Sequence, residues 1–159
     1  MTRWLDDGEQ RTWRAFLAAS QRIQEELDRQ LQRDSGMPHT YYAILVRLSE
    51  AEKRKMRMSE LAGSVGSSPS RLSHAVARLE ERGWVRREPC ESDRRVSWAV
   101  LTDEGLAILV SAAPGHVEAV RRTLFDRLGP EQVEQLSEIC MAILKGVEVQ
   151  DPVLRDPAS

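Results

Sequence analysis

The sequence predicts a mainly α-helical fold with a small β-wing, in which long N- and C-terminal helices flank a winged helix-turn-helix. Three observations support this fold class. Residues 59–82 form two short amphipathic segments around a Gly/Ser turn, residues 85–101 form two strand-like runs around a polar tip, and both ends of the chain carry long apolar helical patterns. A chain of 159 residues suits one compact domain, so residues 1–159 are expected to share a single fold.

The N-terminal part of the chain is expected to form two helices. Residues 9–33 carry apolar side chains at helical spacing, and Gly36 and Pro38 end this pattern. A second helix is expected over residues 38–50. One side of the first pattern carries Trp13, Phe16, Leu17, Ser20, Ile23, Leu27 and Leu31, and the inward-facing side chains of the second are Tyr41, Ile44, Leu45 and Leu48.

A tight turn between two short helices is the most specific local signal. Gly66 can adopt the left-handed conformation that ends a helix, Ser68 can cap the next helix, and Pro69 suits its first position. Ser59 is expected to cap the helix before the turn. In the helix after it, the spacing of Leu72, Ala75, Val76 and Leu79 predicts one inward-facing side.

The segment after this helix predicts a strand pair with an exposed tip. The strands are expected over Val85 to Pro89 and Val96 to Leu101, and the tip over Cys90 to Arg95. Asp93 is expected to pair with Arg95 or with neighbouring amides and to hold the tip in shape. A basic cluster precedes the helix-turn-helix and is either a contact to a nucleic-acid backbone or a solvated charged run: Lys53, Arg54, Lys55 and Arg57.

Two further helices are expected after the strands. Thr102 can cap a helix that contains a predicted kink at Pro114 and Gly115, and a final helix begins at Pro130. The helices in residues 9–33 and 103–146 are longer and more apolar than a winged helix of residues 38–102 requires. We therefore interpret them as dimerisation helices, with residues 147–159 as a tail.

The polar face of the second short helix is suited to DNA recognition. The N-terminal residues of such a helix can enter a major groove, Arg can pair with guanine, and an Arg at a wing tip can contact the backbone or a narrow minor groove. A surface helix also shows polar side chains without any partner, and this alternative stays open. The expected DNA contacts are Ser67, Ser68, Ser70, Arg71, His74 and Arg78, with Arg94 and Arg95 in the wing.

The charge distribution supports the DNA-binding interpretation despite a net charge of −2. Residues 53–95 contain 11 Lys or Arg and 6 Asp or Glu, a net charge of +5, which leaves −7 for the remainder. Because attraction to phosphate decays over roughly 8 Å at physiological salt, the local charge matters more than the total. Double-stranded DNA is therefore the expected partner.

Three segments together resemble the multiple-antibiotic-resistance regulator (MarR) family of bacterial winged-helix repressors. They read MSELAGSV, SPSRLSHAVARLEERGWVRR and DRRVSWAVLTDEG, and the resemblance extends over about residues 10–146. Trp98 departs from the family pattern, which has aliphatic residues on that strand. The resemblance implies a homodimer whose DNA binding is weakened by a small aromatic or phenolic ligand. A twofold dimer is expected to repress by binding a palindromic promoter site. The N-terminus lacks the apolar core of a signal peptide, so a cytoplasmic location is expected.

A candidate ligand site follows mainly from this resemblance. Family ligands bind between the dimer helices and the winged lobe, and aromatic or titratable side chains near that junction are Trp13, Phe16, His39, Tyr41 and Tyr42. An anionic aromatic compound could stack there and bond to His39 or to Arg14. The competing interpretation is that Trp13, Phe16 and Tyr41 are core residues.

Other functional classes have less support in the sequence. There is no phosphate-binding glycine loop, nucleophile elbow or metal-ligand spacing, so no enzyme activity, cofactor or metal is expected. No apolar run is long enough to span a membrane. Two alternatives remain: a winged-helix protein-interaction module, and a thiol-responsive regulator that uses Cys90. The second cysteine, Cys140, is expected to be a small core residue.

Overall fold

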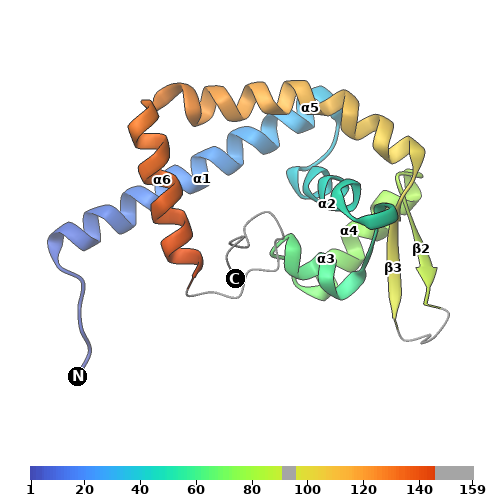
Figure 1. The fold of residues 1–159 in the computed structure, drawn as a ribbon, viewed down its shortest axis with the longest axis horizontal. Coiled ribbons are helices and arrows are strands. Elements are labelled where there is room, and N and C mark those ends of the chain that lie inside the picture. The colour runs from blue at the N-terminus through green and yellow to red at the C-terminus, as the bar shows by residue number, and fades with distance from the viewer. Residues whose placement is uncertain (91–95, 146–159) are drawn as a thin grey trace.

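The computed structural model describes residues 1–90 and 96–145, and it confirms the predicted fold class (Figure 1). The helices pack around and beside a small three-stranded antiparallel sheet. The elements are α1 (Asp7–Ser35), α2 (His39–Glu50), η1 (Glu52–Arg54), β1 (Lys55–Arg57), α3 (Met58–Ser64), α4 (Pro69–Glu81), β2 (Val85–Pro89), β3 (Ser97–Leu101), α5 (Asp103–Thr123), η2 (Phe125–Arg127) and α6 (Pro130–Leu144).

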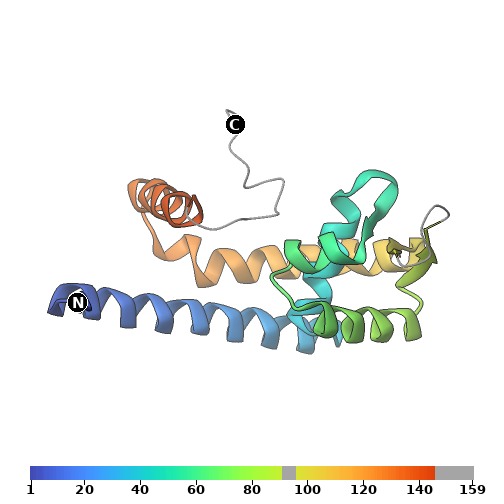
Figure 2. The same cartoon turned by 90° about the horizontal axis from the view of Figure 1, so that it is seen from below.

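Helices α1 and α5 lie side by side along the length of the molecule (Figures 1 and 2). A capping box between Asp6 and Glu9 starts α1, and Gly36, at φ 62°, ends it in the left-handed conformation. Helix α5 begins at the predicted cap, Thr102, whose side chain accepts a hydrogen bond from the Gly105 amide. It continues as one helix through Pro114, where the sequence predicts a kink.

The sheet has the strand order β1-β3-β2, so β3 is central. The strand pair β2 and β3 agrees with the sequence, but β1 was not predicted because a three-residue strand carries too little pattern. The predicted cap at Ser59 is wrong: α3 starts at Met58, and Arg57 is its N-cap residue. Arg57 still pairs with Trp98 in the sheet, so the strand passes directly into the helix and no loop is left for a capping side chain.

The core lies within the winged lobe and at its junction with α1 and α5. Its largest fully buried side chains are Leu31, Met37, Ile44, Leu45, Leu48, Leu61, Leu72, Leu79, Val76 and Val85. The joint between lobe and α5 is hydrogen-bonded on both sides, because Thr102 donates its hydroxyl to the Gly83 carbonyl at 2.7 Å and its amide to the Trp84 carbonyl at 3.1 Å. These two hydrogen bonds connect the start of α5 to the turn that follows α4.

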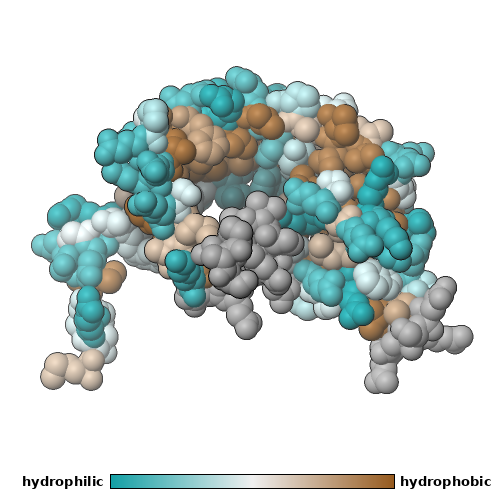
Figure 3. Space-filling model, in the orientation of Figure 1, coloured by the Kyte–Doolittle hydropathy of each residue, from teal (hydrophilic) through white to brown (hydrophobic). Residues whose placement is uncertain are grey.

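Apolar side chains outside the core are exposed on the long helices (Figure 3). They are Trp13, Phe16 and Leu17 on α1, Val110 and Val117 on α5, and Ile139 and Ile143 on α6. Helix α6 has no buried residue, and Cys140, expected in the core, is only half-buried because α6 packs little against the rest of its own chain. None of the helices within residues 1–90 and 96–145 combines the length and apolar character that crossing a bilayer requires.

Candidate nucleic-acid interface

The turn between α3 and α4 has the predicted conformation. Gly66 lies at φ 61°, and the Ser67 amide donates to the Ala62 carbonyl at 2.9 Å, which closes the end of α3. The Ser68 hydroxyl accepts a hydrogen bond from the Arg71 amide at 3.3 Å, and Pro69 occupies the first helical position. These residues fix the direction in which α4 leaves the turn.

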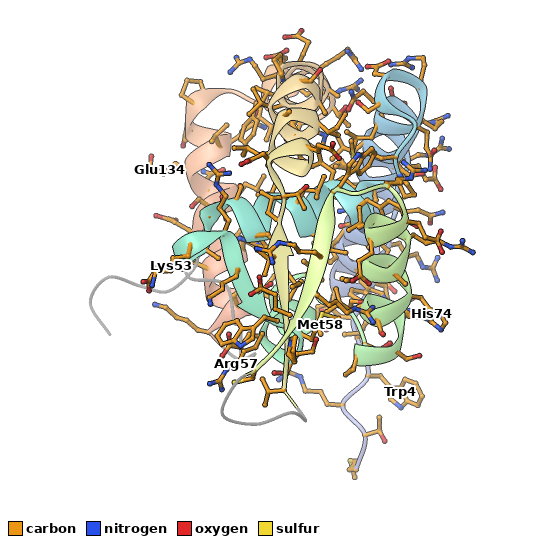
Figure 4. The ribbon with its side chains drawn as sticks, turned by 90° about the vertical axis from the view of Figure 1, so that its right-hand side faces the viewer. Trp4, Lys53, Arg57, Met58, His74 and Glu134 are labelled. Carbon is orange, nitrogen blue, oxygen red and sulfur yellow. The ribbon has the colours of Figure 1, made fainter. Side chains whose placement is uncertain are left out.

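Helix α4 presents its predicted polar face to solvent. Leu72, Ala75, Val76 and Leu79 are buried, whereas Ser70, Arg71, His74 and Arg78 are exposed. Figure 4 shows His74 pointing away from the body of the protein. In the parts of the chain that the structure describes, neither Arg71 nor His74 has an acidic partner, so both side chains are available to an incoming ligand.

Arg78 differs from the other exposed residues of this face. Its guanidinium donates to Glu81 at 2.8 Å, and this hydrogen bond raises the pKa of Arg78 further above its usual value. A phosphate that contacts Arg78 must either replace the Glu81 carboxylate as the partner of the guanidinium or bind beside it. Contacts from Arg71 and His74 need no such exchange.

Arg87 on β2 joins the wing sheet to α4, a role that the sequence analysis missed. Its guanidinium donates to the Ser73 carbonyl at 2.6 Å and lies 3.3 Å from a Glu80 carboxylate oxygen, while its amide donates to Glu80 at 3.0 Å. Arg87 pairs with the buried Ala99, so it lies on the inner side of the sheet. The sequence did contain a signal for this role, because side chains alternate along β2 and Arg87 is a charged residue at a position that faces inward.

The wing strands close around a tip that lies outside the described residues. Pro89 pairs with Ser97, and the Cys90 amide donates to the Val96 carbonyl at 2.9 Å. The predicted contacts Arg94 and Arg95, and the bracing residue Asp93, fall in residues 91–95 and are not described. Cys90, the residue of the thiol-responsive alternative, is half-buried where β2 ends.

Comparison with known proteins identifies the family. The model of the MarR family matches residues 37–97. The crystal structure of Sco3205, a MarR family transcriptional regulator from Streptomyces coelicolor in complex with DNA, has 53% sequence identity and a TM-score of 0.89, covering 93% of this chain and 92% of that chain. The chain belongs to the MarR family.

Other relatives support the same assignment. AbsC, a MarR family transcriptional regulator from Streptomyces coelicolor, shares 44% identity with a TM-score of 0.85 and covers 92% of this chain and 98% of its own. The transcriptional repressor MprA of Escherichia coli K12 is 28% identical over 126 residues, 78% of this chain and 71% of MprA. These relatives place the chain among the transcriptional regulators of the MarR family.

The aromatic residues proposed for a ligand site fall into three separate places in this MarR family chain. Trp13 and Phe16 stack at 6.2 Å between ring centroids on an exposed part of α1. Tyr41 lies 5.7 Å from the guanidinium of Arg82 and packs against the core. Asp28 of α1 bonds to His39 at the start of α2. Phe16 lies about 12 residues before Asp28, which is roughly 18 Å along the helix.

His39 and Tyr42 form the third place, together with His116 of α5. The His116 ring centroid lies 4.3 Å from Tyr42 and 5.6 Å from His39, and Asp28 accepts a hydrogen bond from the His39 amide at 2.8 Å. An open pocket of about 320 Å³ borders them and is lined by His39, Tyr42, Ala43, Val46, Arg47, Glu50 and His116. His116 was not predicted, because it lies 77 residues along the chain from His39 and no local pattern connects them.

Burial sets the protonation behaviour of this junction. It lowers the pKa of both His39 and His116 from the usual value of 6.5, and the neighbouring His39 charge lowers that of His116 further. Burial also raises the pKa of Tyr42. Near neutral pH the pocket therefore offers neutral imidazoles and a phenol hydroxyl, and the His116 Nδ1 atom is buried without a hydrogen-bond partner among the described residues.

Proposed function

We propose that this MarR family regulator is a homodimeric repressor that binds a palindromic promoter site in the cytoplasm and releases it when a small aromatic acid binds. The observation that carries the proposal is the exposed N-terminal face of α4. There Ser70, Arg71 and His74 face solvent, without an acidic partner among residues 1–90 and 96–145. Such a face can enter a major groove, where Arg pairs with guanine and Ser or His bonds to bases or phosphates.

The wing is proposed to supply the second set of contacts. Arg87 ties β2 to α4, so the strands that carry the tip keep a defined position relative to the recognition helix. Arg94 at the tip would then reach the flanking minor groove or backbone, with Arg95 beside it. Bound at a promoter, the protein would block access of RNA polymerase.

A twofold dimer would cover the apolar side chains that a single chain leaves exposed. Trp13 and Phe16 on α1 are 52% and 50% exposed, and Ile139 and Ile143 on α6 are 57% and 55% exposed. Exposed apolar surface on three long helices is typical of a protein–protein interface. A dimer would also place two recognition helices about 34 Å apart, one turn of DNA.

The pocket at His39, Tyr42 and His116 is the best-supported effector site. Its volume of about 320 Å³ suits a single aromatic ring. Arg47, which pairs with Glu50 at 3.4 Å, lies at its edge and could turn toward a ligand carboxylate, while Tyr42 offers an aromatic surface. Because the pocket joins α2 to α5, an occupant would shift the winged lobe relative to the long helices.

Binding-site selection from random duplex DNA tests the DNA-binding part of the proposal. A palindromic motif with half-sites about 10 base pairs apart is expected. Replacing Arg71 with Ala should change which bases are preferred, at roughly 1–3 kcal/mol for each lost base contact, whereas Arg94→Ala should weaken binding to all sequences alike. Wild-type affinity of both variants would refute the assignment of the interface.

Light scattering and ligand titration test the dimer and the effector. A dimeric mass in dilute solution is expected, and a monomer that keeps full DNA affinity would contradict the dimer. Phenolic and benzoic acids should quench Trp fluorescence and release labelled DNA from the wild type, and a His116→Ala variant should respond more weakly. Equal responses from both proteins would remove the pocket from the mechanism.

A further inference from the structure

Trp98 lies on the outer face of the wing sheet, opposite Arg57 of the edge strand β1. Side chains alternate along a strand, and the buried Ala99 and Leu101 define the inner face of β3. On β1, Met56 packs against the core, so Lys55 and Arg57 on either side of it lie on the outer face. The outer face therefore presents a half-buried indole with two cations on the neighbouring strand.

Both cations lie over the Trp98 ring. The Lys55 Nζ atom is 5.1 Å from the ring centroid, and the Arg57 guanidinium carbon is 5.4 Å from it. These distances are within the range of about 6 Å over which an aromatic face attracts a cation. Within residues 1–90 and 96–145, neither Lys55 nor Arg57 forms an ion pair with a carboxylate, so both charges remain open to an external anion.

The neighbouring basic residues behave differently. Arg54 pairs with Asp103 at 3.0 Å, and Arg86 pairs with Glu88 of the same strand, β2. Lys53 and Arg54 also lie at the opposite end of β1 from the wing loop. The basic cluster that precedes the helix-turn-helix is therefore divided into Lys53 and the paired Arg54 at the base of the sheet and a ring-supported group, Lys55 and Arg57, on β1.

The strand register places Arg57 of the ring-supported group toward the wing loop. Arg57 pairs with Trp98, the second residue of β3, so it lies at the end of the sheet from which the wing loop leaves. In Figure 4, Arg57 lies near that end of the strands, Lys53 lies farther from it, and His74 of α4 lies on the other side of the wing strands. A duplex in contact with α4 and the wing would extend past this edge.

We propose that Trp98 is a positioning residue for DNA binding, which holds Lys55 and Arg57 against the phosphate backbone outside the bases read by α4. The indole face restrains both cations and leaves their N–H groups free to donate to phosphate oxygens. The contact adds affinity without base preference. This inference rests on the proposed function, since it requires the same docking of α4 and the wing.

Fluorescence anisotropy at several salt concentrations tests the role of the cations. The probes are a labelled duplex of about 30 base pairs carrying the selected operator, long enough for two half-sites and their flanks, and a random duplex of equal length. Arg57→Gln should lower the slope of log K against log salt by about 0.9 for each lost phosphate contact, and about twice that in a dimer. Lys53→Gln is the matched control, and its slope should equal that of the wild type.

Variants of Trp98 then separate positioning from folding. Trp98→Leu should weaken binding to both duplexes by roughly 2- to 5-fold for each cation released, whereas Trp98→Phe keeps an aromatic face and should retain most of the affinity. In the Arg57→Gln background, Trp98→Leu should have a smaller effect than it has alone. Thermal unfolding of each variant shows whether it is folded at the assay temperature.

The outcomes distinguish this inference from the proposed function. If the wild type binds the operator and Arg57→Gln has an unchanged salt slope, the inference is wrong and the interface of α4 stands. If Trp98→Phe loses as much affinity as Trp98→Leu, or if the Trp98 and Arg57 effects are simply additive, Trp98 does not act through these cations. If the wild type binds no duplex DNA, the proposed function itself fails.

Discussion

Gly105 lies where an added Cβ would meet neighbouring backbone, and its replacement by Ala is the sharpest stability test. An ideal Cβ at this position would lie 2.1 Å from the Trp84 carbonyl oxygen and 2.8 Å from the Leu101 Cδ1 atom. The Trp84 carbonyl also accepts a hydrogen bond from the Thr102 amide, at the joint between the winged lobe and α5. A methyl group here must displace backbone, because no flexible side chain alone can make room.

The cost follows from three contributions. Inserting a methyl group into a packed site costs about 1–3 kcal/mol, and the upper end applies because the clash is with backbone. A weakened Thr102–Trp84 or Gly105–Thr102 hydrogen bond costs about 1 kcal/mol, and the higher helix propensity of Ala returns about 1 kcal/mol. Gly105→Ala is therefore expected to lower the free energy of unfolding by about 3 kcal/mol.

Urea unfolding at one fixed protein concentration measures this cost, since the apparent stability of a dimer depends on concentration. Gly115→Ala is the matched control within the same helix. Its Cβ would lie 3.2 Å from the Gln30 Nε2 atom and 3.6 Å from an Asp34 oxygen, both at the ends of side chains and neither on backbone. We expect Gly115→Ala to change stability by less than about 1 kcal/mol. A Gly105→Ala protein as stable as this control would refute the reasoning.

Two further predictions concern the cap of α4 and the histidine pair. Ser68→Ala should cost about 1 kcal/mol of stability by removing the cap on the Arg71 amide, whereas Ser68→Asp should keep the cap and still weaken DNA binding by repelling phosphate. Equal stability of wild type and Ser68→Ala would contradict the capping role. Because burial lowers the pKa of His39 and His116 below 6.5, the unfolded chain binds more protons, so the unfolding free energy should fall as pH drops below about 6.5. The double variant His39→Gln, His116→Gln should flatten this dependence in urea midpoints measured against pH, and an unchanged slope would count against it.

The helix-turn-helix could be predicted in detail because its signals are local. The left-handed Gly66, the cap at Ser68 and the first-turn Pro69 each act within a few residues, and all three are confirmed. The inward face of α4 also follows from spacing alone. Ser59 shows the limit of local reasoning, since the pairing of Arg57 with β3 removes the loop in which Ser59 would have acted as a cap.

The residues that sequence reasoning missed owe their roles to partners far along the chain. Arg87 binds the Ser73 carbonyl of α4, and His116 meets His39 and Tyr42 of α2. Trp98 was visible only as an unusual residue on a strand until the register of β1 placed cations over it. In each case the relevant neighbour is set by packing between elements.

Periodicity and turn chemistry were sufficient to predict the order of the helices, the strand pair β2 and β3, and the solvent-facing side of α4, because each depends on residues close together in the sequence. Tertiary structure decided which charges are available and which are paired. Arg54 is paired with Asp103 of α5, whereas Arg57 lies over the Trp98 ring of β3. It also separated Trp13 and Phe16 from the pocket at His116, since a straight helix keeps its two ends apart. Residue type sets what a side chain can do, and the packing of distant elements decides which partner it meets.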